Sequence, residues 1–237
     1  MPNEESDTLF ARTTVTQNEK AYCALEELIV IGGLPPGSQW SEIALAETIG
    51  LGRTPTREAL QKLAYQGLVR IAPRQGVFIS DVDYQGQLKV IQARREIERL
   101  IVAQAAQWAN AKELASLQQI ARELENLKKS KDMRMYMRLH FALTRVLGEA
   151  SRNSYAAEFY SKLQTLARRF LYFHPTRHNV EQICDLHIRQ VEAVIARDIK
   201  GAVDTAVARN DYAETFARDI LMEMIATSAV TIRLADT

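Results

Sequence analysis

The chain has 237 residues, of which 47% are hydrophobic and 25% are charged, with a formal net charge of +1. This composition is that of a folded globular protein and excludes an extended disordered chain. The net charge is too small to attract nucleic acid by itself, so any nucleic-acid-binding surface must come from a local cluster of basic residues. No segment approaches the roughly 18 apolar residues of a membrane span, and the first residues are acidic. We therefore expect a cytoplasmic protein without a membrane partner.

Glycine and proline divide the chain into two parts. They are frequent between residues 32 and 86, whereas after residue 86 only Gly148, Pro175 and Gly201 remain. Because both residue types mark turns, the first third should contain short elements and the remainder long helices. We predict a flexible N-terminus at 1–14, a first domain at 15–80, a linker at 81–87, a second domain at 88–229 and a tail at 230–237.

The first domain begins with segments of helical periodicity. Apolar residues recur at helical spacing, Ser41 is a typical N-cap, and Gly50–Gly52 form a tight turn. Thr54 and Pro55 are expected to cap and start the helix that follows, since proline is tolerated in a first turn. The predicted helices span 17–31, 42–49 and 54–66.

Two short β-prone runs complete the first domain. Residues 68–71 and 77–79 are rich in Val, Ile and Phe, and the connection between them ends in Gly76. This pattern predicts a β-hairpin. Two helices, a tight turn, a third helix and a hairpin, in that order, predict a winged helix-turn-helix.

After residue 83 the chain has helical periodicity almost throughout. Helices of this number and length predict an all-α bundle of six to seven helices. The overall fold class is therefore mainly α. The predicted helices span 83–108, 111–129, 132–150, 153–173, 179–197 and 200–228.

The start of the third helix carries Arg53 and Arg57, one turn apart. The first residues of a recognition helix meet base edges in the major groove, and the arginine fork fits the O6 and N7 atoms of guanine. Residues 53–74 contain five basic side chains and Glu58 as the single acid, a local charge of +4. The alternative is that these arginines are solvated residues of a protein-interaction module.

The first domain resembles the winged helix of GntR-family regulators. The resemblance is carried by residues 34–37, 45–63, 67–69 and 76–79, and one departure is Gly52, where Ser or Thr is commoner. It implies a homodimer that binds a palindromic double-stranded DNA operator. The DNA-binding residues that it implies are Arg53, Thr54, Pro55 and Arg57 in the helix and Arg74, Gln75 and Gly76 in the wing.

The second domain resembles the FCD domain of FadR-type regulators. The segments that carry this likeness are 95–98, 139–141, 150–153, 186–188 and 193–202. The resemblance implies a metal site formed by one Asp and three His. His140 and His187 match two of these ligands, whereas Tyr136 and Arg209 stand at the other two positions. His140 and His187 are thus the candidate metal ligands, with Zn or Ni as the candidate cofactor and no cofactor certain.

The four positions can still meet in space. Tyr136 and His140 are four residues apart and share a helix face, and His187 and Arg209 each lie 11 residues from Asp198. In an antiparallel helical hairpin this spacing places them at a similar height, where Arg209 could bind a carboxylate. The histidines could instead be ordinary core residues. The candidate effector-binding residues are Arg95, Tyr136, His140, Asn153, His187 and Arg209.

These observations favour a sequence-specific DNA-binding transcription regulator, expected to be a repressor, whose operator affinity a small carboxylate controls. The chain lacks a nucleophile elbow, a P-loop, a GxGxxG fingerprint and an HExxH motif, so no enzymatic activity is expected. Two alternatives remain. One is a DNA-binding protein without an effector, and the weaker one is an enzyme that uses a pocket at His140 and His187.

Overall fold

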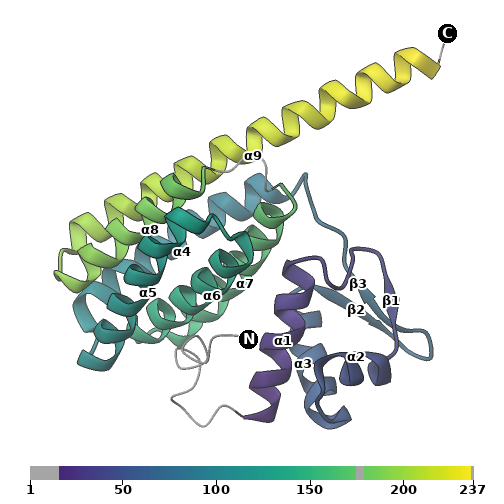
Figure 1. Cartoon of the computed structure of the whole chain (residues 1–237), viewed down its shortest axis with the longest axis horizontal. Coiled ribbons are helices and arrows are strands. Elements are labelled where there is room, and N and C mark those ends of the chain that lie inside the picture. Colours follow the sequence, from purple (N-terminus) through teal and green to yellow (C-terminus); the bar gives the residue numbers. More distant parts are fainter. Residues whose placement is uncertain (1–15, 175–178, 236–237) are drawn as a thin grey trace. The chain divides into compact units, whose positions relative to one another are not determined.

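The computed structural model describes residues 16–174 and 179–235 (Figure 1). The predicted flexible N-terminus lies outside these residues. The chain divides into two compact units, Met1–Val82 with Leu171–Phe173 and Asp83–Phe170 with His174–Thr237. We call them the N-terminal unit and the helical unit.

The N-terminal unit is a winged helix-turn-helix, as the sequence predicted. Its elements are α1 (Gln17–Val30), β1 (Gln39–Trp40), α2 (Glu42–Ile49), α3 (Arg53–Tyr65), β2 (Val69–Ala72) and β3 (Gly76–Ile79). The sheet is antiparallel in the order β1-β3-β2, with Val77 opposite both Trp40 and Ile71. β1 was not predicted, because a strand of two residues has no readable alternation of apolar and polar side chains.

Local capping and a shared core define the helices of this unit. The side chain of Thr16 accepts a hydrogen bond from the backbone N of Glu19, and that of Ser41 accepts from Ala44 N at 3.0 Å. Gly50 ends α2 in the left-handed conformation at φ 66°. The buried core residues include Leu25, Ile29, Leu45, Leu60, Leu63 and Val77.

The start of α3 differs from the prediction. The helix begins at Arg53, and Gly52 rather than Thr54 occupies the N-cap position, where it offers no side-chain hydrogen bond. Thr56 Oγ1 instead donates to the Gly52 carbonyl at 2.8 Å. Pro55 fits inside the first turn because the backbone N–H groups there have no partner within the helix.

The helical unit is an α-bundle, also as predicted (Figure 1). α5 packs against both α6 and α8, and α4 packs against α6, α8 and α9. No helix in the described part of the chain is long and apolar enough to cross a membrane. The helices are α4 (Gln87–Trp108), α5 (Ala111–Ser130), α6 (Met133–Ala150), α7 (Ser154–Tyr172), α8 (Val180–Ile195) and α9 (Ile199–Ala235).

Side-chain caps explain several starts of these helices. Asn110 and Glu113 form a reciprocal capping box at α5, and Asp132 and Asn179 cap α6 and α8. The end of the last helix was predicted wrongly. α9 continues to Ala235, through most of the predicted tail at 230–237, because no glycine or proline follows Gly201 to interrupt it.

Candidate nucleic-acid interface and buried polar site

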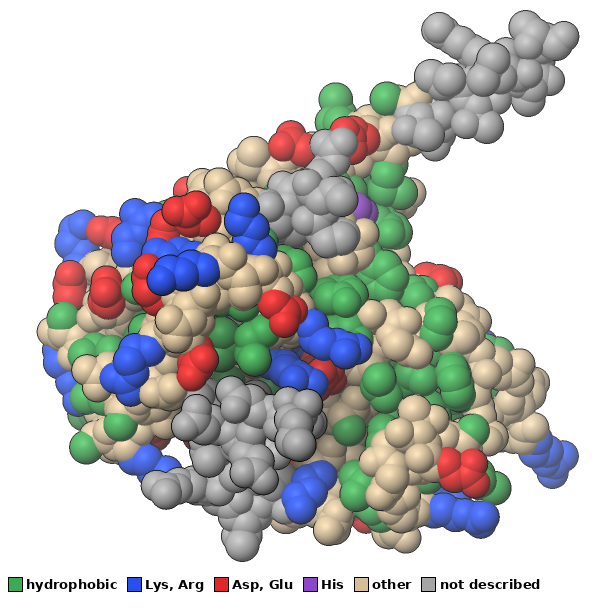
Figure 2. Space-filling view, viewed as in Figure 1, with side chains coloured by type: hydrophobic (Ala, Val, Ile, Leu, Met, Phe, Trp, Pro, Cys, Tyr) green, Lys and Arg blue, Asp and Glu red, His purple; other side chains and the backbone are tan. Residues whose placement is uncertain are grey.

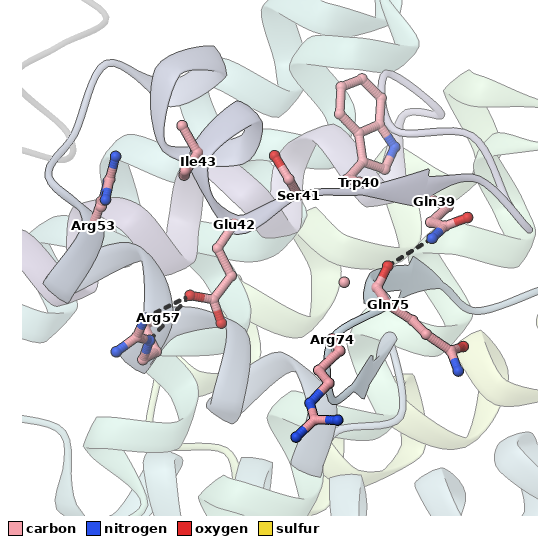
Figure 3. A pocket seen from close by; sticks show the side chains of 10 residues that line it. Gln39, Trp40, Ser41, Glu42, Ile43, Arg53, Arg57, Arg74 and Gln75 are labelled. Carbon is pink, nitrogen blue, oxygen red and sulfur yellow. Dashed lines mark hydrogen bonds and ion pairs between the residues drawn. The ribbon is translucent and has the colours of Figure 1, made fainter.

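A groove of about 570 Å³ opens in the N-terminal unit between the starts of α2 and α3 and the turn that joins β2 to β3 (Figure 3). We call it the basic groove. Three arginines and one glutamate line it, so its formal charge is +3 − 1 = +2. Its lining residues are Gln39, Trp40, Ser41, Glu42, Ile43, Arg53, Arg57, Arg74, Gln75 and Gly76.

The arginines reach the basic groove from separate places. Arg53 is the first residue of α3, Arg57 lies one turn further, and Arg74 lies in the turn between β2 and β3. All three are exposed. The structure thus brings together Arg53, Arg57, Arg74, Gln75 and Gly76 from the predicted DNA-binding set. The other two members of that set, Thr54 and Pro55, follow Arg53 in α3 but do not line the groove.

The turn between β2 and β3 has a tightly defined backbone. Arg74 and Gly76 adopt positive φ angles of 63° and 104°. A Cβ atom at Gly76 would lie 2.5 Å from the Trp40 carbonyl oxygen, so only glycine fits there. Gln39 Nε2 donates to the Gln75 carbonyl at 2.6 Å and fastens the turn to β1 (Figure 3).

Glu42 pairs with Arg57 inside the basic groove. Nε and Nη2 of Arg57 both lie 3.0 Å from Glu42 Oε2, and the two side chains are 63% and 32% exposed. An exposed pair of this kind adds little to stability, but it fixes the direction of the guanidinium. This partner was not predicted from the sequence, because Glu42 there indicates only an acidic residue in the first turn of a helix.

Charge on the rest of the surface is mixed. On the face drawn in Figure 2, Lys and Arg side chains lie among Asp and Glu side chains over the helical unit. This agrees with the net charge of +1 and leaves the basic groove as a local feature.

The second group of predicted residues meets in the interior of the helical unit. Tyr136 and His140 from α6 lie beside His187 from α8, and all three are buried. Tyr136 Oη and His187 Nε2 are 2.9 Å apart, and the imidazole centroids of His140 and His187 are 4.7 Å apart. His140 Nε2 lies 3.2 Å from Gln164 Oε1 of α7. The spacing in the sequence predicted that Tyr136, His140 and His187 lie close together, as they do, but it did not predict the contact with Gln164.

Glu98 of α4 is the acidic centre of a second group of buried polar side chains, and its partner Arg209 acts on the pKa of both histidines. Its carboxylate accepts hydrogen bonds from Arg209 Nη1, from Asn210 Nδ2 at 2.9 Å and from Gln190 Nε2 at 3.2 Å. Arg94 Nε lies 3.9 Å from the same carboxylate and donates to Asn210 Oδ1 at 2.9 Å. Two buried guanidinium groups therefore share one buried carboxylate, which leaves a formal charge of +1.

We call these nine residues the buried polar cluster, and five helices contribute to it. Its members are Arg94, Glu98, Tyr136, His140, Gln164, His187, Gln190, Arg209 and Asn210.

Burial fixes the protonation states in this cluster. It lowers the pKa of His140 well below its usual range, and the neighbouring His187 and Arg209 lower it further. Burial and then Arg209 do the same to the pKa of His187. Burial raises the pKa of Tyr136. For Arg209, burial acts to lower the pKa, but Glu98, Tyr160 and Tyr136 together outweigh burial, so the pKa is raised. The imidazoles and the phenol are consequently neutral near pH 7, while Arg209 is charged.

The donors of this cluster do not fit a divalent metal. Among the described residues, no group of three or more His, Cys, Asp or Glu side chains could hold a metal ion. The Tyr136 phenol holds its proton, and Glu98 already accepts from Arg209. A zinc site needs three or four protein ligands, and the charge of Arg209 opposes a second cation. The candidate ligands His140 and His187 are thus adjacent, but no third ligand lies beside them among the residues that the structure describes.

The two remaining candidate effector residues lie elsewhere in the helical unit. Arg95 pairs with Asp211 and Glu214 of α9, at 3.0 Å for the latter. Asn153 Oδ1 accepts from Ala156 N at 3.0 Å in the first turn of α7. Among the described residues, neither side chain forms a hydrogen bond or ion pair with a member of the buried polar cluster.

Comparison with known proteins agrees with this two-part architecture. The family model described as bacterial regulatory proteins, gntR family, matches residues 17–79, and that of the FCD domain matches residues 89–211. The HTH-type transcriptional regulator McbR of Escherichia coli K12 is 31% identical over 109 residues, which are 46% of this chain and 49% of McbR. The regulator YdhC of Bacillus subtilis is 30% identical over 104 residues, 44% of this chain and 46% of YdhC. The chain thus matches about half the length of these relatives.

Solved structures share the fold over most of the chain. E. coli McbR/YncC covers 88% of this chain and 100% of its own, with a TM-score of 0.71 at 22% identity. A GntR structure from Rhodococcus sp. RHA1 covers 86% and 98%, with a TM-score of 0.63 at 17% identity. The FCD match alone extends over more than half of the sequence. The chain therefore belongs to the GntR family of bacterial regulatory proteins and carries an FCD domain after its winged helix.

Proposed function

We propose that this protein is a transcription regulator that binds a double-stranded DNA operator through the basic groove. The observation that carries the proposal is the convergence of Arg53, Arg57 and Arg74 on one groove with a formal charge of +2. Phosphates are attracted by such a groove, and arginine forks can read base edges from it. The named role of McbR as an HTH-type transcriptional regulator supports the same assignment.

In this proposal α3 enters the major groove and the turn between β2 and β3 reaches the minor groove. The residues assigned to the helix are Arg53, Thr54, Pro55 and Arg57, and those assigned to the wing are Arg74, Gln75 and Gly76. A homodimer would place two such units on a palindromic site, since operator symmetry mirrors protein symmetry.

The experiment starts from purified full-length protein and a random duplex library, from which the preferred sequence is selected. We expect Arg57→Ala to lose about 1–3 kcal/mol of affinity for that sequence, the usual discrimination of one arginine–guanine contact. Lys20→Ala removes an exposed charge outside the basic groove and serves as the control. Equal affinity of the wild type for selected and scrambled duplexes would overturn the proposal.

The second part of the proposal is that a small carboxylate binds at the buried polar cluster and changes operator affinity. Two arginines share one carboxylate there, so an anion would complete the charge balance. Nδ1 of His140, Nδ1 of His187 and Nε2 of Gln164 are buried without a hydrogen-bond partner among the described residues, and could bind polar ligand atoms. Arg95 and Asn153 remain candidates for an outer part of this site.

A thermal-shift screen of small carboxylates, followed by operator binding with each hit, tests this part. A ligand that changes the operator affinity by a given factor must have its own affinity changed by the operator by the same factor. We expect His187→Gln to weaken the response to the ligand while operator binding without ligand is unchanged. Release of DNA by the ligand, together with increased transcription from the operator, would indicate a repressor that is relieved by its effector. If no carboxylate changes the melting temperature or DNA affinity, the protein is a regulator without a carboxylate effector.

A further inference from the structure

We infer that Glu42 is a positioning residue that sets sequence specificity by holding Arg57 in the orientation for reading one guanine. The inference rests on the proposed DNA-binding function and deepens it. Glu42 lies in α2, whereas Arg57 lies in α3.

The geometry of the pair leaves the reading edge of Arg57 available. Nε and Nη2 both donate to a single oxygen of Glu42, each at 3.0 Å (Figure 3). The contact therefore uses one side of the planar guanidinium. Nη1 and the second N–H of Nη2 form the adjacent edge, and this edge is the fork that matches guanine O6 and N7.

Glu42 is itself held by a rigid element. It is the first residue of α2, directly after the N-cap Ser41, whose Oγ accepts from Ala44 N. Its side chain is only 32% exposed. By contrast, Arg53 and Arg74 form no ion pair with another residue in the described part of the chain. Arg57 is thus the groove arginine with a fixed direction, and a preorganised side chain loses less entropy when it binds.

Apart from this positioning role, the negative charge of Glu42 in the basic groove is unfavourable for DNA binding. Without it the basic groove would carry +3 instead of +2, and a groove built only for phosphate would bind DNA more tightly. Fold stability does not explain the pair either, since exposed ion pairs contribute little. The Glu42 carboxylate weakens the attraction of the groove for any DNA and directs one arginine. This is the arrangement expected where sequence specificity is gained at some cost in affinity.

The test compares Glu42→Ala, Glu42→Asp, Arg57→Ala and the double variant Glu42→Ala/Arg57→Ala with the wild type. Glu47→Ala is the matched control, because it removes the same charge from the same helix at an exposed position outside the groove. Affinities are measured by fluorescence anisotropy for the duplex selected by the wild type, for each of its single-base variants and for a scrambled duplex.

We expect Glu42→Ala to lose about three- to tenfold in discrimination at one G·C pair, the same pair at which Arg57→Ala loses discrimination. Its affinity for the scrambled duplex should stay equal or rise. Glu42→Asp keeps the charge but shortens the reach, so it should lose discrimination without a change in affinity for the scrambled duplex. The double variant should discriminate no worse than Arg57→Ala alone, while Glu47→Ala should behave as the wild type.

The outcomes separate the inference from the proposed function. If the wild type prefers no sequence, the proposed function itself is wrong. The inference alone would be overturned if the wild type prefers one sequence and both Glu42 variants discriminate against every single-base variant as well as the wild type does. Independent, additive losses from the two single substitutions would also overturn it, because Glu42 acts through Arg57 in this account.

Discussion

The two units use the same ion pair in opposite environments. In the basic groove, Arg57 and Glu42 are 63% and 32% exposed, whereas in the buried polar cluster Arg209 and Glu98 are 7% and 0% exposed. Water screens the first pair, so it contributes little to the stability of the fold. The second pair has lost its hydration, and each member depends on the other. In our proposal, the same kind of pair directs DNA recognition in one unit, whereas in the other it compensates buried charge.

The largest expected effect comes from removing the buried carboxylate. Glu98→Gln leaves Arg209 and Arg94 buried without a countercharge and should cost about 3–5 kcal/mol of unfolding free energy. Glu42→Gln, the equivalent change in the basic groove, should cost less than about 1 kcal/mol. Urea unfolding followed by circular dichroism measures both. Equal costs would show that burial does not separate the two pairs.

A pH titration should destabilise only one of the two units. Burial lowers the pKa of His140 and His187 in the folded protein, so below the ordinary value near 6.5 the unfolded chain binds more protons. The histidine contribution to stability is therefore intact above about pH 6.5. It decreases by about 1.4 kcal/mol per histidine and pH unit below that, until the folded pKa is reached.

Hydrogen exchange at pH 7.5 and 5.5, corrected for intrinsic rates, resolves the two units separately. All four histidines of the sequence follow residue 139. The protection of residues 16–82 should therefore be the same at both pH values, whereas that of the helical unit should be lower at pH 5.5. His187→Gln should remove about half of the pH dependence. Loss of protection in both units to the same extent would contradict this assignment.

Backbone strain gives the N-terminal unit its own sensitive position. Gly76→Ala would place a Cβ atom 2.5 Å from the Trp40 carbonyl oxygen at a φ of 104°. We expect a loss of about 1–3 kcal/mol, together with weaker operator binding, because the turn between β2 and β3 must shift. Gly67→Ala, also at positive φ but with open space around it, is the control for the φ effect alone. Equal behaviour of the two variants would exclude a role for the close approach to Trp40.

The sequence predicted the elements of both units because their determinants are local. Ser41, Gly50 and the periodic apolar residues are visible without knowledge of the fold. The winged helix and the helical bundle followed from them and were confirmed. The errors lie where a short or uninterrupted segment has no local signal, as at β1 and at the end of α9.

The sites were harder to predict, for a physical reason. Spacing correctly placed Tyr136, His140 and His187 together, because helical periodicity fixes which residues share a face. Glu98 and Gln164 lie on other helices, and only the packing of the bundle brings them into contact. Single sequences do not encode such partners as a local pattern, and the same is true of Glu42 beside Arg57.

The smallest expected effect concerns the start of α3. Gly52 is the N-cap but has no side chain to accept a hydrogen bond, and its φ of −67° and ψ of 160° suit any residue. Gly52→Ser should stabilise the N-terminal unit by a few tenths of a kcal/mol, since serine can accept from the N–H of Thr54, whereas Pro55 at the next position has no N–H to donate. Thermal unfolding and operator binding should be measured together, with Gly52→Ala as the control that adds a side chain without an acceptor. A gain in DNA affinity for the serine variant beyond its gain in stability would mean that the hydroxyl contacts phosphate, and that this unit gave up one such contact by having glycine at position 52. Equal stability of the serine and alanine variants would contradict the capping argument.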